Sequence, residues 1–139
     1  MTATIYGIVQ AIAAKARALT GMRAAPDNVP DNIAAYPFAV TYLLRAEWGG
    51  NDATWLTSRR QTYACDIHLS RLPDVGRVLA AFPELPRSLA IAIISDETLG
   101  GACTAVETVR ANFQVMGYSG VETVGYHCEI DVVVTEAKT

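Results

Sequence analysis

Apolar residues recur along this chain with two different periods, and the period changes from one segment to the next. Near the N-terminus they recur at steps of three and four residues, the spacing of one helix face. This predicts a helix that Thr2 or Thr4 caps and that runs to about Leu19, with Gly21 as its stop. The apolar stripe consists of Ile5, Ile8, Val9, Ile12, Ala16 and Leu19.

Four later segments alternate between apolar and polar residues, the period of a strand whose two faces meet different surroundings. They predict strands at about 38–48, 56–70, 103–116 and 121–135. In the last of these, His127, Glu129 and Asp131 lie opposite a continuous apolar face. That face consists of Val124, Tyr126, Cys128, Ile130, Val132 and Val134.

Glycine-rich turns at 49–52 and 117–120 join these strands into two predicted hairpins. Between the hairpins, a helical region starts at Pro73-Asp74, is broken by Pro83 and Pro86, and resumes as a second helix over 89–94. We therefore expect one α+β domain over 1–139. Its four-stranded, mostly antiparallel sheet would carry the N-terminal helix and the central helical segment on one face.

The segment 21–36 separates the first helix from the first strand and contains Pro26 and Pro30, with Pro37 following. Proline removes a donor and restricts the residue before it, so neither helix nor central strand can pass through this linker. Connections of this length are usually either functional or disordered. The polar residues Asp27, Asn28, Asp31 and Asn32 are either plain turn residues or a segment that orders against a partner.

Composition narrows the class of protein. The chain has 139 residues, is 51% apolar and 18% charged, and carries a net charge of −3. The high apolar content excludes a disordered chain. The negative net charge gives no sign of a basic surface that would bind nucleic acid. Because no apolar run reaches the ~18 to 20 residues that cross a bilayer, we expect no membrane partner. Three cysteines and no secretory start favour free thiols in a reducing cytoplasm.

The pairs Cys65/His68 and His127/Cys128 suggest a zinc site, since Cys and His are the usual zinc ligands. Strand geometry argues against it, because the two members of each pair face opposite sides of a strand. Both cysteines fall on apolar faces, where a thiol behaves as a small hydrophobe. We therefore expect buried thiols and no metal or other cofactor.

Catalytic motifs are lacking as well. Ser119 lies in Gly-Tyr-Ser-Gly, one residue short of a nucleophile elbow and between two strands, so a hairpin turn is the better interpretation. Glu129 and Asp131 share the polar strand face. This favours a surface that faces solvent, or the lumen of an assembly, over an acid/base pair. We expect no enzyme activity.

Loop residues are the better candidates for function. Trp48 and Trp55 flank the 49–54 hairpin tip and form either an interface or a cross-strand pair that closes the hairpin. The candidate interface residues are Asp27, Asn28, Asp31, Trp48, Asn51, Asp52 and Trp55.

Two stretches resemble the tail terminator, or tail-completion, proteins of long-tailed bacteriophages. The first is APDNVPDNIAAYPFAVTY, a proline-rich acidic linker that enters a strand at Pro-Phe. The second is DETLGGACTAVETVRANFQVMGYSGVETVGYHCEIDVVV, similar to that family's Leu-Gly-Gly loop, long third strand, turn and final strand. Here the linker has separated prolines with Asp where the family often has paired prolines with Glu, and 71–94 matches only as helix.

The resemblance implies a structural virion protein at the head–tail junction, assembled in the bacterial host. It would form a ring, typically a hexamer, that caps the tail tube of major tail proteins and meets the head-completion proteins. DNA would pass through the lumen, to which we expect either the face with Asp66, Glu129 and Asp131 or the acidic linker to contribute. A head–tail connector subunit, or a small α/β ligand-binding domain or enzyme, is the alternative.

Overall fold

The computed structural model describes residues 4–31, 35–49, 55–71 and 75–137. The elements follow the predicted order of helix, hairpin, helical segment and hairpin. They are α1 (Ile5–Arg17), β1 (Phe38–Gly49), β2 (Trp55–Arg71), α2 (Val75–Ala81), α3 (Leu85–Ile94), β3 (Ala105–Tyr118) and β4 (Val121–Ala137).

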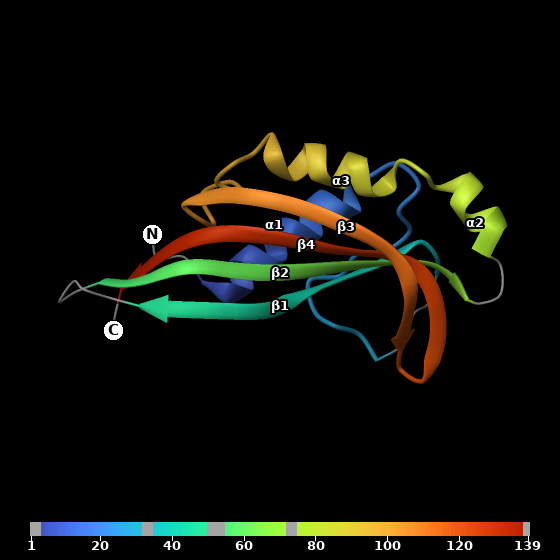
Figure 1. Cartoon of the computed structure of the whole chain (residues 1–139), viewed down its shortest axis with the longest axis horizontal. Helices are drawn as coiled ribbons and strands as arrows, with labels where there is room; N and C mark the ends of the chain where they lie inside the picture. The colour runs from blue at the N-terminus through green and yellow to red at the C-terminus, as the bar shows by residue number, and fades with distance from the viewer. Residues whose placement is uncertain (1–3, 32–34, 50–54, 72–74, 138–139) are drawn as a thin grey trace.

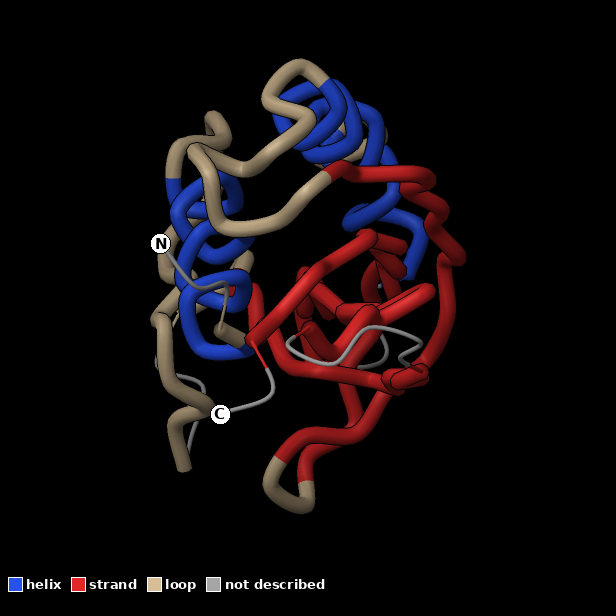
Figure 2. Tube along the Cα trace, turned by 90° about the vertical axis from the view of Figure 1, so that its left-hand side faces the viewer, coloured by secondary structure: helices blue, strands red, loops and turns tan. Residues whose placement is uncertain are grey.

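The four strands form one sheet in the order β1-β2-β4-β3, and every neighbouring pair is antiparallel. Each hairpin supplies two adjacent strands, and the pairing of β2 with β4 joins the hairpins. Helix α1 packs against β1 and β2, α3 packs against β3, and the two helices touch each other (Figure 1). Figure 2 shows the helices gathered on one side of the curved sheet. The predicted α+β fold is confirmed.

The core lies between this helical layer and the apolar sheet face. All six apolar β4 residues predicted from alternation are buried, and so are Tyr63, Cys65, Ile67 and Leu69 of β2. On α1 the stripe through Ile8 and Ile12 is fully buried against them. Each such side chain contributes about 1.5–3 kcal/mol before conformational entropy is counted. On α1, β2 and β4, periodicity thus identified the buried face correctly, whereas Leu79 of α2 and Val115 of β3, also assigned to apolar faces, are exposed.

The helix-free sheet face is less open than its polar residues suggest. The end of the β3–β4 hairpin curls over this face (Figure 1) and brings Tyr118 near the start of β1. The Tyr118 ring centroid lies 6.4 Å from that of Phe38 and 5.5 Å from that of His68. His68 is buried here and bonds the Thr123 hydroxyl, with 2.6 Å between Nδ1 and Oγ1. This end of the polar face is therefore a second, smaller core.

Several predicted boundaries shift for identifiable reasons. Helix α1 ends at Arg17, and Gly21, with φ +91°, lies in the turn beyond it. Helix α3 begins at Leu85, because Pro86 falls in the first turn, where a missing N–H costs nothing. Strand β3 spans Ala105–Tyr118 rather than 103–116, and the turn shrinks to Ser119 and Gly120. Both have positive φ, 51° and 78°, as two-residue hairpin turns require.

A substitution at Gly125 tests the close approach of the two central strands, β2 and β4. A Cβ added there would lie 1.8 Å from the Ile67 carbonyl oxygen, a backbone atom that cannot move without disturbing β2. We predict that Gly125→Ala lowers the free energy of unfolding by roughly 3 kcal/mol. Gly117→Ala is the control, because nothing lies within 4 Å of its added Cβ. Urea unfolding measures both, and equal effects would contradict the prediction.

Candidate functional site

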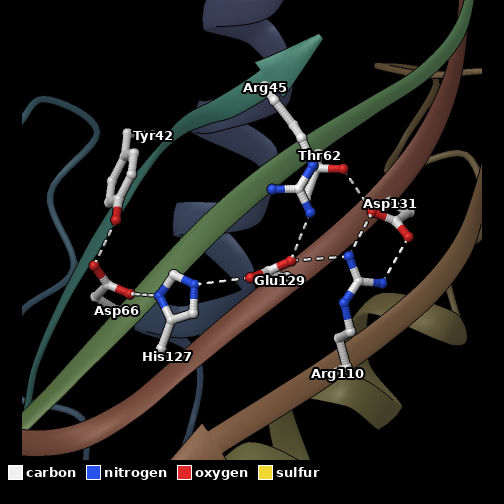
Figure 3. A network of polar contacts seen from close by, with 8 residues as sticks. All are labelled: Tyr42, Arg45, Thr62, Asp66, Arg110, His127, Glu129 and Asp131. Atoms are coloured by element: carbon white, nitrogen blue, oxygen red, sulfur yellow. Dashed lines mark hydrogen bonds and ion pairs between the residues drawn. The ribbon is translucent and has the colours of Figure 1, made fainter. Parts of the chain in front are cut away.

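A continuous network of polar side chains crosses the helix-free face of the sheet (Figure 3). Alternation places the members from β2, β3 and β4 on this face, and a register shift between Leu43 and Arg45 brings Arg45 to the same side of β1 as Tyr42. The antiparallel register then brings them together, with Asp66 opposite His127 and Glu129 opposite Arg110. All four strands contribute. The network consists of Tyr42, Arg45, Thr62, Asp66, Arg110, His127, Glu129 and Asp131.

Asp131 is the most deeply buried charge in this network, with 4% of its side chain exposed. Arg110 reaches it from β3, with 2.7 Å between Nη1 and Oδ2 and 3.1 Å between Nη2 and Oδ1. The Thr62 hydroxyl donates to Oδ1 from β2 over 2.7 Å. Three strands thus meet at one carboxylate, which is satisfied by a bidentate arginine.

Glu129 and Asp66 complete the network on either side of His127. Oε1 of Glu129 accepts from Arg110 at 2.9 Å and from Arg45 at 3.0 Å. The His127 ring lies between Oε2 of Glu129, 3.0 Å from Nε2, and Oδ1 of Asp66, 2.5 Å from Nδ1. The Tyr42 hydroxyl donates to Oδ2 of Asp66 over 2.8 Å. Every oxygen of the three carboxylates therefore has a donor or a histidine nitrogen facing it.

These contacts shift the pKa of several groups. The hydrogen bond from Arg110 is the main cause that lowers the pKa of Glu129. Burial would raise the pKa of Asp131, but Arg110 and Thr62 outweigh it and lower it. Burial would likewise lower the pKa of His127, yet Asp66 and Glu129 raise it. Burial, followed by the bond to Asp66, raises the pKa of Tyr42. At neutral pH the face holds paired charges.

A second feature is a groove along α1, where the proline-rich linker comes close to the Leu-Gly-Gly loop. This groove of about 520 Å³ is lined by α1, by Asp27 of the linker and by the loop through Leu99 and Ala102. Nη1 of Arg17 holds the linker in place, with 2.7 Å to the Ala25 carbonyl and 2.7 Å to Oδ1 of Asp27. The linker and the Leu-Gly-Gly loop therefore form one surface.

The linker is more closely bound to the domain than its prolines suggest. Ala24 pairs with the edge of β1, where its carbonyl accepts from the Ala39 N–H over 2.9 Å. The Tyr118 hydroxyl donates to the Pro30 carbonyl. Of the predicted interface residues in this segment, Asp27 is engaged by Arg17, whereas Asn28 and Asp31 are exposed.

The hairpin-tip candidates are only partly described. Trp48 is 47% exposed at the end of β1. In the strand register it lies opposite Ser58, while Trp55 lies opposite Ala137 of β4, so the two tryptophans are not directly opposite each other. Asn51 and Asp52 lie outside the described residues. An interface role for these four residues stays a prediction.

Cys65 and Cys128 lie where strand alternation places them, on the core face and away from the histidines. Cys65 and Cys128 are opposite each other across β2 and β4, and both are fully buried. Burial raises the pKa of Cys65 to about 12, so its thiol is inert at neutral pH. Within the described ranges, no three His, Cys, Asp or Glu side chains form a group that could hold a metal.

Sequence reasoning located the three carboxylates but missed their partners Arg110, Arg45 and Tyr42. Alternation puts Arg110 on the same face as Glu129, because Val109 and Ala111 flank it in a predicted strand. That signal gives the face only. The strand order and register, which bring Arg110 opposite Glu129, come from the folded sheet.

Comparison with known proteins adds no family. The sequence matches no protein-family model and no curated protein. Among the described helices, none is both long enough and apolar enough to span a membrane.

Arg110 tests whether the network supports the fold. We predict that Arg110→Met lowers the free energy of unfolding by about 2 kcal/mol, because Asp131 stays buried without its cation. Arg60→Met is the matched control. Arg60 pairs with Glu107 over 3.4 Å, and both side chains are exposed, so the change should stay within about 0.5 kcal/mol. Chemical denaturation at pH 7 compares them, and similar losses would refute a special role for Arg110.

Proposed function

We propose that this chain is a tail-terminator-like structural subunit, which assembles as a ring on a finished phage tail tube. One observation carries the proposal beyond sequence resemblance. The acidic linker and the Leu-Gly-Gly loop, which are far apart in the sequence and carry the resemblance, line the same groove with α1. Two segments that shared only a family pattern thus form a single surface able to serve a single contact.

The fold is compatible with this role. A ring of identical subunits uses two different surfaces on each copy, because each subunit meets one neighbour on either side. The four-stranded sheet offers a helical side, which carries the linker–loop groove, and a separate helix-free side. The proposed partners are further copies of the chain, six in all by analogy with the family's hexamers, together with the major tail protein and the head-completion protein.

The polar network determines how the residues proposed to line the lumen would present their charges. If Asp66, Glu129 and Asp131 face the channel, they do so as paired groups rather than as a free acidic surface. Arg45 and Arg110 are engaged by carboxylates and are therefore poorly placed to hold DNA phosphates. Such a lining would let DNA pass without tight binding. A head–tail connector subunit shares these properties and is the alternative proposal.

Tube capping is the direct test. Purified protein should form a ring, measured by light scattering after size exclusion and seen by electron microscopy. Added to polymerising major tail protein, it should shorten the tubes and appear at one end only. A protein that stays monomeric and leaves tube length unchanged would contradict the proposal. Binding to a head connector in place of the tube end would favour the connector alternative.

The 49–54 hairpin tip provides a second test. Deleting residues 51–54 should leave the free energy of unfolding within about 1 kcal/mol of the parent, since shortening a loop tip changes closure entropy little. We predict that the same variant caps tubes poorly. Circular dichroism and the capping assay measure the two effects, and loss of the folded monomer would show that the tip does more than make contacts.

A further inference from the structure

Both ring nitrogens of His127 face carboxylate oxygens. Nδ1 lies 2.5 Å from Oδ1 of Asp66, and Nε2 lies 3.0 Å from Oε2 of Glu129. A neutral imidazole carries one N–H and can donate to only one of them, whereas an imidazolium donates to both. The three side chains are 15–18% exposed, so water cannot fully replace a lost contact. The geometry therefore favours the imidazolium, which carries a proton on each ring nitrogen.

We propose that His127 is a proton-operated clasp between the two β-hairpins. Asp66 belongs to the first hairpin and His127 and Glu129 to the second, so the imidazolium forms an ion pair across the β2–β4 joint. When the proton leaves, one nitrogen becomes an acceptor facing a carboxylate. Glu129 then keeps its two arginine donors on Oε1, and Asp66 keeps its bond from Tyr42 on Oδ2, but the carboxylate oxygen that faces the deprotonated nitrogen loses its donor.

The charges around His127 favour its protonated form. His127 contacts Asp66 of β2 and Glu129 of its own strand. The other charged and titratable groups in the network are Tyr42 and Arg45 from β1, Arg110 from β3 and Asp131 from β4 (Figure 3). With the imidazolium, the three carboxylates are balanced by three cations. Loss of the proton leaves one uncompensated negative charge. The clasp does not depend on the proposed ring.

The sign of the pH effect follows from the direction of the shift. The pKa of His127 is raised in the folded protein, above its ordinary value of 6.5. Because the folded protein binds this proton more tightly than the unfolded chain does, the protonated His127 stabilises the fold. The stabilisation is complete below pH 6.5 and is lost as the pH rises through the pKa of the folded state. Burial lowers the pKa of His68, the other histidine, so its ring stays neutral over the same range.

Nuclear magnetic resonance of the two imidazoles tests the clasp in the intact chain. We expect one ring to titrate above pH 6.5, with ¹⁵N shifts showing both nitrogens protonated below its midpoint, and this signal to vanish in His127→Gln. Glu129→Gln should lower the midpoint by about one pH unit, since it removes an opposite charge. Glu122→Gln, an exposed change on the same strand, should leave it unmoved.

Thermal unfolding gives an independent readout. The melting temperature of the parent chain should fall as the pH rises through the His127 midpoint, and that fall should be absent in His127→Gln. A midpoint at or below 6.5, or one that Glu129→Gln leaves unchanged, overturns the proposal. The titration of Glu129→Gln decides the matter even if His127→Gln fails to fold. Neither result bears on tube capping, so the two proposals fail separately.

Discussion

The pairing of β2 with β4 is the interaction on which the rest of this structure depends. It joins two hairpins that are separated in the chain by α2 and α3, and it runs along nearly the full length of both strands. Strands β1 and β3 are held in the sheet through these two. Gly125 allows the backbones to approach closely where β4 passes the Ile67 carbonyl. On both faces of the sheet, this register decides which side chains of the two hairpins lie beside each other.

On one face, the register brings together the side chains of the buried core. Cys65 lies opposite Cys128 and Tyr63 opposite Ile130, all fully buried beneath the helices. Thr41 joins this layer, opposite Cys65, and its hydroxyl lies in an apolar setting near the thiol. On the other face the same register aligns Asp66 with His127 and Thr62 with Asp131. The polar network is therefore a direct consequence of how the hairpins meet.

Charge pairing on that face changes how the acidic residues are understood. A carboxylate that accepts hydrogen bonds from an arginine presents little free charge to a passing anion, and Asp131 is almost fully buried as well. The helix-free face combines this balanced network with a tightly packed end where Tyr118 covers His68. The groove formed by the linker and the Leu-Gly-Gly loop lies apart from it, against α1. Two surfaces of different chemistry are thus available for different contacts.

The local features of this protein were readable from its sequence because each depends on residues a few positions apart. Periods of two and 3.6 residues identified the strands, the helix and their buried faces, so Ile12, Cys128 and Val132 were correctly placed in the core. Strand geometry likewise separated the cysteines from the histidines. Errors came where a local rule has two outcomes, as at Pro86, which starts a helix as readily as it breaks one.

Contacts between distant segments were decided by the tertiary structure alone. Alternation states which face a residue occupies but not which strand lies beside it, so Arg110, Glu129 and His127 could not be joined before the strand order was known. The same holds for the linker, whose prolines predict an irregular path while Arg17 and Ala39 determine where that path runs. Periodicity is a property of neighbours in the chain. The strand register, the bending of the β3–β4 hairpin over the sheet and the charge pairing arise only when distant strands meet.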